Sequence, residues 1–219
     1  MLTASEENYL KTIYHLAGKS SRPVSTNALA TALHTKPASA TDMIQRLSKK
    51  GLVSYHKYKG VTPTTGGRKL ALRVIRKHRL WEVFLVQKLK FNWDEVHEVA
   101  EQLEHVESEQ LIEQLDKYLG YPKYDPHGDP IPGSDGSMAP LPSTTLAMLQ
   151  PGDKGRVICA RDSSSEFLLF LDKLHISLGA AIEVLDKFAY DDSFSIRVDE
   201  ALPITLSSKA AENIYVEKI

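Results

Sequence analysis

The sequence predicts a mainly α-helical protein that ends in a small β-rich domain. Over roughly the first 120 residues, apolar side chains recur at the three- and four-residue spacing of amphipathic helices. After Thr144 short alternating runs replace that pattern, and the segment between, 121–143, contains six prolines that forbid a regular helix. A chain of 219 residues is long enough for several such domains.

The first part of the chain predicts three short helices. One begins after Thr3 and ends at Gly18, and Ser25 caps a second. The third begins near Lys36-Pro37, because proline is tolerated in a first helical turn, and stops at Gly51.

A hairpin is predicted next. The run LVSYHKYKGVTPTT is rich in β-branched and aromatic residues, and Lys59-Gly60 marks its turn. Three helices followed by a basic hairpin are the order of a winged helix-turn-helix domain, which we assign to residues 1–65.

Three further helices are predicted before the proline-rich segment. They run from about Gly66 to Leu89, from about Asp94, a plausible cap, to Val106, and from about Ser108 to Leu119. They define a helical domain at 66–122, followed by a Pro/Gly-rich linker at 123–143.

The C-terminal domain, 144–219, is predicted to be a compact β-rich barrel. Its strand-like runs are KGRVICARD, AAIEVLDKF, FSIRVD and NIYVEKI, and FLLFLDKLHI between the first two predicts a short helix.

The composition is that of an ordinary globular protein, with 42% apolar and 25% charged residues. A single cysteine, Cys159, excludes an internal disulfide and a cysteine-rich zinc site. The N-terminus lacks the basic-then-apolar order of a signal peptide, and no apolar run is long enough to cross a bilayer. We therefore expect a cytoplasmic protein without a membrane partner.

Charge is unevenly distributed, although the net charge is only −1. Residues 1–80 carry 15 Lys and Arg against 3 Asp and Glu, whereas residues 81–150 carry 4 against 13. The basic part indicates a polyanionic partner, most simply nucleic acid. The acidic middle would repel that partner and could instead attract cations.

The third predicted helix has an apolar face and a small polar, then basic, face. Small polar residues suit close approach to base edges in the major groove, and basic residues suit phosphates. The alternative is a solvated basic face, but the order of the elements and the charge together favour DNA binding. The candidate DNA-binding residues are Ser25, Lys36, Pro37, Ala38, Ser39, Thr41, Asp42, Arg46, Lys49, His56, Lys57 and Lys59.

A dense strip of carboxylates and imidazoles, HEVAEQLEHVE, occupies residues 97–107. On one helix Glu101, Glu104 and His105 are spaced i, i+3 and i+4 and would share a face, with His97 one turn earlier. Mixed oxygen and nitrogen ligands suit Mn²⁺, Fe²⁺, Co²⁺ or Zn²⁺. The alternative is an exposed acidic helix whose glutamates are simply solvated.

Two further features bear on this strip. His78 and Glu82 are also spaced i, i+4 and add a second pair of candidate ligands. His97-Glu98 begins like the zinc-protease motif HExxH, but the second histidine position is Glu101. Because that spacing fails and no nucleophile–base set is apparent, we do not expect an enzyme.

These residues resemble the diphtheria toxin repressor and manganese transport regulator family (DtxR/MntR) of bacterial metal-dependent transcription factors. The C-terminal part is more loosely similar to the family's SH3-like (FeoA-like) domain. Through the first 133 residues the matching stretches are, in family order, ENYLKTIYHL, KPASATDMIQRLSKKGLV, TPTTGGRKLA, RKHRLWEVFL, EVHEVAEQLEHV and HGDPIPG.

The resemblance implies a homodimer that binds a pseudo-palindromic operator in double-stranded DNA and represses genes of metal-ion uptake or homeostasis. The implied effector is Mn²⁺, or alternatively Fe²⁺, with Zn²⁺, Co²⁺ and Ni²⁺ expected to act in vitro. The apolar stripe from Trp81 to Leu89 fits a dimer contact, and ordinary core packing is the alternative.

The resemblance also implies a primary metal site at Asn8, Glu101, Glu104 and His105. Glu101 stands where iron-sensing members have a cysteine, and glutamate there is typical of manganese sensors. Asn8 stands where the family has aspartate or methionine, so its amide contributes no charge. Lys11 stands where two-domain manganese regulators have a glutamate, so their paired-metal arrangement is not expected.

A second site is implied with two alternative ligand sets that share Glu82. Iron-type members use one set, and some streptococcal-type manganese regulators use the other. The matching positions are His78, Glu82 and His97 for the first set, and Glu82, Asp125, His127 and Asp162, with Glu166 as an alternative to the last, for the second. Simple turn chemistry in the linker remains the alternative for Asp125 and His127.

Two rival functions stay open. A metalloenzyme or metal-storage protein would bind metal without any effect on DNA. A metal-independent winged-helix regulator would bind DNA regardless of chelator.

Overall fold

The structure is a computed structural model that describes residues 2–18, 22–56, 59–92, 95–162 and 164–219. The chain divides into two compact units, and the boundary falls within one long helix. One unit comprises Met1–His78, Glu104–Glu107 and Pro132–Ser137, and the other comprises Arg79–Leu103, Ser108–Ile131 and Met138–Ile219.

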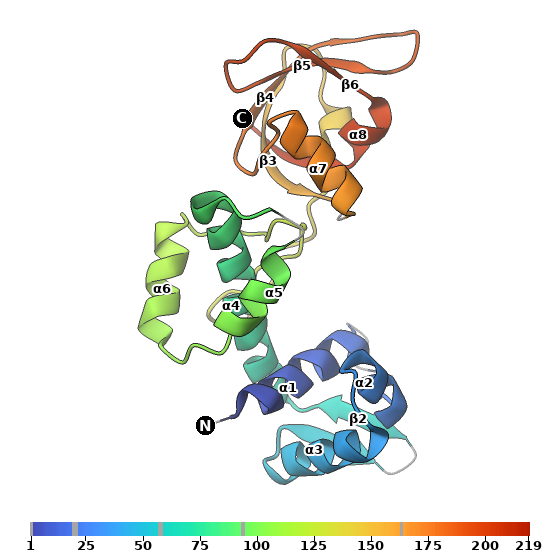
Figure 1. Cartoon of the computed structure of the whole chain (residues 1–219), viewed down its shortest axis with the longest axis vertical. Helices are drawn as coiled ribbons and strands as arrows, with labels where there is room; N and C mark the ends of the chain where they lie inside the picture. Colours follow the sequence, from blue (N-terminus) through green and yellow to red (C-terminus); the bar gives the residue numbers. More distant parts are fainter. Residues whose placement is uncertain (1, 19–21, 57–58, 93–94, 163) are drawn as a thin grey trace. The chain divides into compact units, whose positions relative to one another are not determined.

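The first unit is built around three short helices and a hairpin (Figure 1). Its elements are α1 (Ala4–Ala17), α2 (Thr26–Ala32), α3 (Pro37–Lys49), β1 (Val53–His56), β2 (Gly60–Pro63) and the start of α4 (Thr65–Leu89). Thr3 and Glu6 form a reciprocal capping box at α1, Ser25 accepts a hydrogen bond from the N–H of Ala28, and Pro37 begins α3. The predicted helix order is therefore confirmed.

The three helices share one core, whose fully buried members include Leu10, Ile13, Leu29, Ile44 and Leu47. The antiparallel pairing of β1 and β2 runs from Val53 opposite Pro63 to His56 opposite Gly60. Gly60 has φ 108°, and a Cβ there would lie 2.6 Å from the carbonyl oxygen of Val24, so only glycine fits. The winged helix fold predicted for this part is confirmed.

The second unit begins with the rest of α4, followed by α5 (Val96–Leu103) and α6 (Glu109–Tyr118). Leu85 and Val86 of α4 are buried in one core with Val96 and Ala100 of α5. Part of the Trp81–Leu89 stripe is thus core in the chain itself.

One helix end differs from the prediction. The spacing predicted a helix to about Val106, but α5 ends at Leu103, and Glu104 and His105 lie in the following turn. The Glu104 carboxylate is fully buried against Lys11 and His78, and this tertiary pairing replaces the helical continuation. Asp94, the expected cap, lies outside the described residues.

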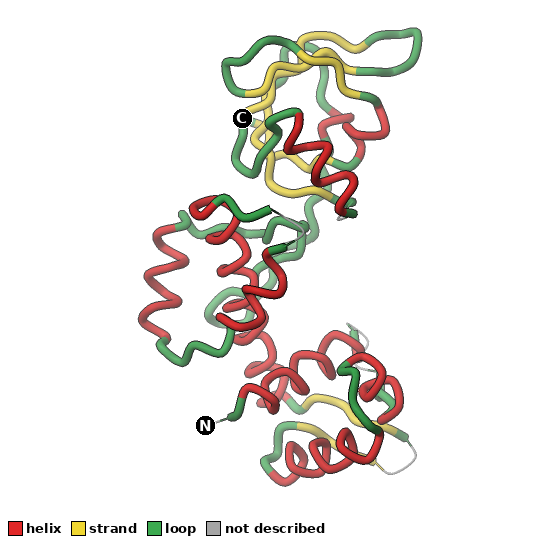
Figure 2. The backbone as a smooth tube through the Cα atoms, viewed as in Figure 1, coloured by secondary structure: helices red, strands yellow, loops and turns green. Residues whose placement is uncertain are grey.

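The C-terminal part is a five-stranded antiparallel sheet in the order β6-β5-β4-β3-β7, drawn in yellow in Figure 2. Its elements are η1 (Leu146–Met148), β3 (Lys154–Ala160), α7 (Ser165–Lys173), β4 (Ala181–Lys187), β5 (Phe194–Val198), β6 (Ile204–Leu206), α8 (Ser208–Glu212) and β7 (Ile214–Lys218). In β5 the alternate residues Phe194, Ile196 and Val198 are buried, as their pattern predicts. The small β domain is confirmed, although η1, β6 and α8 were not predicted.

The segment 121–143 forms no helix; a β-bridge joins Tyr124 and Pro130, and backbone hydrogen bonds such as that from the Ile131 N–H to the Lys123 carbonyl hold its turns. Among the described residues, no helix is both long and apolar enough to cross a membrane.

Candidate metal centre and nucleic-acid interface

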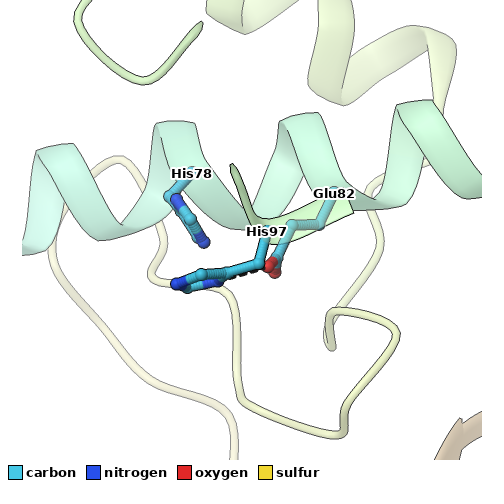
Figure 3. Close-up of side chains that lie close together, drawn as sticks. All are labelled: His78, Glu82 and His97. Carbon is cyan, nitrogen blue, oxygen red and sulfur yellow. Dashed lines mark hydrogen bonds and ion pairs between the residues drawn. The ribbon is translucent and has the colours of Figure 1, made fainter. Parts of the chain in front are cut away.

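Helix α4 carries the first group of candidate ligands. His78 and Glu82 are buried and lie one turn apart on the helix. Figure 3 shows their side chains together with that of His97, which a hydrogen bond of 3.2 Å joins through Nδ1 to Oε1 of Glu82. In the part of the chain that the structure describes, these three form the only group of at least three His, Cys, Asp or Glu with ligand atoms all within 4.8 Å.

Glu82 also faces residues of the linker. Its Oε1 lies 4.0 Å from Nε2 of His127. Asp125 is 3% exposed, and its Oδ2 lies 3.3 Å from Nε of Arg79. Burial, and then the Glu82 charge, raise the pKa of Asp125 to about 7, although the Arg79 guanidinium acts to lower it. Residues of both predicted second-site sets therefore gather around one glutamate.

Asp125 also organises its own turn. Its Oδ1 accepts the backbone N–H groups of His127 and Asp129, each at 2.9 Å. The turn chemistry expected as an alternative is thus present, and the other carboxylate oxygen faces Arg79.

The candidates from the C-terminal domain make local contacts. Asp162 accepts the N–H of Ser164 at 2.9 Å, and the hydrogen bonds from Ser164 lower the pKa of Asp162. Glu166 is exposed in the first turn of α7. The buried Cys159 is a poor ligand candidate at neutral pH, because burial raises the pKa of its thiol to about 12.

Glu104 and His105 contact side chains of α1. Nζ of Lys11 lies 2.7 Å and 2.8 Å from the two carboxylate oxygens of Glu104, and Nδ1 of His78 lies 2.6 Å from one of them. Nδ1 of His105 lies 2.6 Å from Oε2 of Glu7. Burial alone would raise the pKa of Glu104, but the hydrogen bond with His78 and the Lys11 ammonium outweigh it and hold that pKa below its ordinary value.

Asn8 lies on α1 between Glu7 and Lys11, and its Oδ1 is buried without a hydrogen-bond partner. A buried amide oxygen without a partner is costly, which makes it an acceptor suited to a hard cation. The donor set as a whole offers carboxylate and amide oxygens with imidazole nitrogens, which fits Mn²⁺ or Fe²⁺.

Glu101, the remaining primary-site candidate, lies on α5 and is half exposed. Its Oε1 is 3.6 Å from Nε2 of His97, one helical turn earlier. Because α5 ends at Leu103, Glu101 does not share a continuous helix face with Glu104 and His105.

The candidate DNA-binding residues lie on α3 and the hairpin. Pro37, Ala38, Ser39, Asp42 and Arg46 are exposed along α3, as are Lys36 and Lys49 at its ends. Thr41 is half-buried, and its hydroxyl donates to the carbonyl of Pro37. Ser25, His56 and Lys59 are exposed, and Lys57 lies outside the described residues.

Three residues of these networks were not proposed from the sequence. Glu7, Lys77 and Arg79 each contact a candidate ligand or its partner: Glu7 contacts His105, Lys77 lies 3.8 Å from Glu7, and Arg79 contacts Asp125. The available signal was spacing, since Glu7 and Lys11 are one turn apart and flank Asn8.

Three family models match the chain in sequence order. They are the N-terminal DNA binding domain of iron dependent repressors over residues 1–61, the metal binding and dimerisation domain of the same repressors over 64–133, and the FeoA domain over 144–218.

Known proteins agree with these matches. The chain is 30% identical to the diphtheria toxin repressor of Corynebacterium diphtheriae over 197 residues, which are 85% of this chain and 86% of that protein. It is 36% identical to the iron-dependent repressor IdeR of Mycobacterium leprae over 132 residues, 60% of this chain and 57% of the relative. The chain thus spans little more than half the length of IdeR.

A solved manganese-dependent transcriptional repressor, in complex with manganese, matches with a TM-score of 0.63 and 38% identity over 98% of this chain and 100% of that one. The chain belongs to the iron-dependent repressor family, of which the diphtheria toxin repressor is a member.

Proposed function

We propose that the protein is a metal-activated, DNA-binding repressor of genes for metal-ion uptake or homeostasis, with Mn²⁺ as its effector. The observation that carries the proposal is the group His78, Glu82 and His97, whose ligand atoms lie within 4.8 Å of one another in a chain that also has a winged helix. Family membership supports the same function.

The primary metal site would be held by Asn8, Glu101, Glu104 and His105. Asn8 is on α1 of the winged helix domain, and Glu104 and His105 lie against the same helix through Lys11 and Glu7. A bound divalent cation would supply the positive charge that lets these oxygen and nitrogen donors converge without mutual repulsion. By binding the same ion, Asn8 would connect α1, and with it the winged helix domain, to the turn that carries Glu104 and His105.

The winged helix domain would contact DNA through the exposed face of α3. Its small and polar residues Ser39 and Asp42 suit base edges, whereas Arg46 and Lys49 suit phosphates. As a homodimer, the protein would place two such helices on half-sites about one helical turn apart, which accounts for a pseudo-palindromic operator.

An effective switch needs a large energetic preference. Moving the DNA-competent population from 1:99 to 99:1 takes about 5.5 kcal/mol of preferential metal binding. Linkage requires that operator DNA tightens metal binding by the same factor.

The test is selection from a random duplex pool at fixed salt, with chelated protein and with Mn²⁺, anaerobic Fe²⁺ or Zn²⁺ restored. Capture only with metal is expected, with Mn²⁺ effective at the lowest free concentration. If the protein captures as much DNA in chelator as with metal, it binds DNA independently of metal. Metal binding without any effect on capture would instead favour a storage protein or enzyme.

Matched variants assign the ligands. Glu101→Ala is expected to abolish metal-dependent capture while leaving the circular dichroism spectrum unchanged. Glu98→Ala removes an exposed carboxylate from the same helix and serves as the control. If Glu101→Ala protein still requires metal for capture, Glu101 is not a regulatory ligand.

The alternative within the family is an Fe²⁺ effector. A primary site with glutamate and without thiolate favours Mn²⁺, because soft ligands are absent, but affinity for divalent ions rises from Mn²⁺ to Fe²⁺ in general. Relative activation at matched free concentrations therefore decides between the two ions.

A further inference from the structure

The ammonium group of Lys11 contacts Glu104, a predicted metal ligand. Its Nζ lies 2.7 Å and 2.8 Å from the two oxygens of Glu104. The carboxylate is fully buried, and the lysine side chain is 12% exposed. His78 approaches one of the same oxygens, so both oxygens are already engaged.

His105 has an anionic partner on the same helix. Nδ1 of His105 lies 2.6 Å from Oε2 of Glu7, and Glu7 and Lys11 are one turn apart on α1. One face of α1 therefore contacts both predicted ligands: the Lys11 ammonium contacts the Glu104 carboxylate, and the Glu7 carboxylate contacts the His105 imidazole.

We propose that Lys11 is a tethered cation that competes with the divalent effector for Glu104 and thereby sets the metal concentration at which the repressor responds. The inference rests on the proposed function, because it takes Glu104 and His105 as holders of the regulatory metal. A buried carboxylate needs a counter-charge, and Lys11 supplies it until the effector replaces it.

The helix offers Lys11 a second partner. When Glu104 and His105 turn to the effector, Lys11 and Glu7 are both released. They are spaced i, i+4 with the glutamate N-terminal, which is the favourable orientation for a helical ion pair. Lys77, 3.8 Å from Glu7, can share that carboxylate. In the metal-bound state Lys11 and Glu7 would therefore pair with each other, and neither charge would be left without a partner.

Two features of α1 then act in one direction. Asn8 donates an oxygen without a negative charge, and Lys11 adds a positive charge beside the same ligands. Both weaken cation binding, so this chain is tuned to respond at a higher free metal concentration than a variant without Lys11.

The test is calorimetric titration of the chelator-treated full chain with Mn²⁺ at constant pH and salt. Lys11→Met removes the charge and keeps much of the apolar stem, and it is expected to lower the Kd for Mn²⁺ by about tenfold or more, since the ion no longer has to break the charged hydrogen bonds between Lys11 and Glu104. Lys11→Arg keeps the charge and should stay near the wild-type Kd. Lys69→Met, at an exposed position of α4, is the matched control and should not change it.

An unchanged or higher Kd for Lys11→Met would overturn the proposal. Thermal unfolding provides a second readout: the variant should melt at a lower temperature than wild type in chelator, because Glu104 loses its counter-charge, and gain more from Mn²⁺. If Lys11→Met does not fold in chelator, Lys11→Gln, which can still donate to Glu104, is titrated in its place with the same expected direction.

The two proposals fail differently. Wild-type protein whose capture of DNA ignores metal would refute the proposed function. Wild-type protein that needs metal, together with a Lys11→Met variant of unchanged Kd, would refute only the tethered cation.

Discussion

Arg79 and Asp125 form a buried ion pair between helix α4 and the linker turn, with 3.3 Å between Nε and Oδ2. A second carboxylate, Asp129, lies 3.0 Å from Nη2 of the same guanidinium but is 61% exposed. Arg79 thus has one buried and one exposed carboxylate partner. Replacing each carboxylate in turn therefore compares the contribution of a buried ion pair to stability with that of an exposed one.

Above pH 7, where Asp125 is ionised, Asp125→Ala is expected to destabilise the metal-free protein by about 3 kcal/mol, because the buried Arg79 charge loses a partner and the N–H groups of the turn lose their acceptor. Asp129→Ala should cost less than about 1 kcal/mol, as exposed pairs do. Urea unfolding measures both. Equal costs would show that burial does not distinguish the two carboxylates.

The second metal site is expected to use His78, Glu82 and His97 rather than the linker residues. The reason is proximity: His97 lies 3.2 Å from Glu82, whereas His127 lies 4.0 Å from it. After gel filtration in Mn²⁺, His97→Ala protein should retain one ion fewer per chain than wild type, and His127→Ala protein should retain the wild-type number. Glu82→Ala, which both ligand sets share, is the positive control; the reverse result for the two histidines would assign the linker set.

Stability near α1 should depend on pH through Glu6. The hydrogen bond from Lys50, followed by that with Thr3, lowers the pKa of Glu6 below 4.5. A carboxyl group with a lowered folded-state pKa stabilises the protein above its unfolded pKa, and that contribution is lost as pH falls below about 4.5.

Glu6→Gln keeps an acceptor for the Thr3 N–H but loses the ion pair with the partly exposed Lys50, so it should cost about 1 kcal/mol or less at pH 7, and less still at pH 3.5. Thermal melts of both proteins at the two pH values measure the difference. A cost that is the same at both values would mean that the ionised form of Glu6 contributes nothing.

Salt dependence can locate the DNA-binding surface. Arg46 is exposed near the end of α3. Arg46→Ala should weaken metal-dependent DNA binding and reduce the slope of log K against log salt by about 1, if one phosphate contact is lost. Lys123→Ala removes an exposed charge from the linker and should leave the slope unchanged. Fluorescence anisotropy between 50 and 200 mM salt gives both slopes; equal slopes for wild type and Arg46→Ala would exclude Arg46 from the interface.

Much of the fold could be predicted because its signals are local. Ser25 and Pro37 mark helix starts, and Phe194, Ile196 and Val198 mark one face of a strand, all within a few residues. The end of α5 at Leu103 could not be predicted, because the burial of Glu104 depends on Lys11, 93 positions away. Strand β6 has only three residues, Ile204–Leu206, too few for a periodic pattern.

The candidate site divides in the same way. His78 and Glu82 are paired by helical spacing, which the sequence shows directly. Arg79 with Asp125 and Glu7 with His105 join distant positions, and neither pair leaves a local pattern. Spacing along the sequence shows which residues share one face of a helix. It does not show which faces of different elements pack together.

The engagement of both Glu104 oxygens by Lys11 has a consequence for the speed of the response. If Glu104 holds the effector as proposed, an incoming ion must wait for the ammonium to leave. With rapid mixing, the observed rate of Mn²⁺ uptake is expected to level off at high Mn²⁺ concentration, at the opening rate of the ion pair, rather than to keep rising. Brief rises in metal that end before the pair opens would then pass without a response.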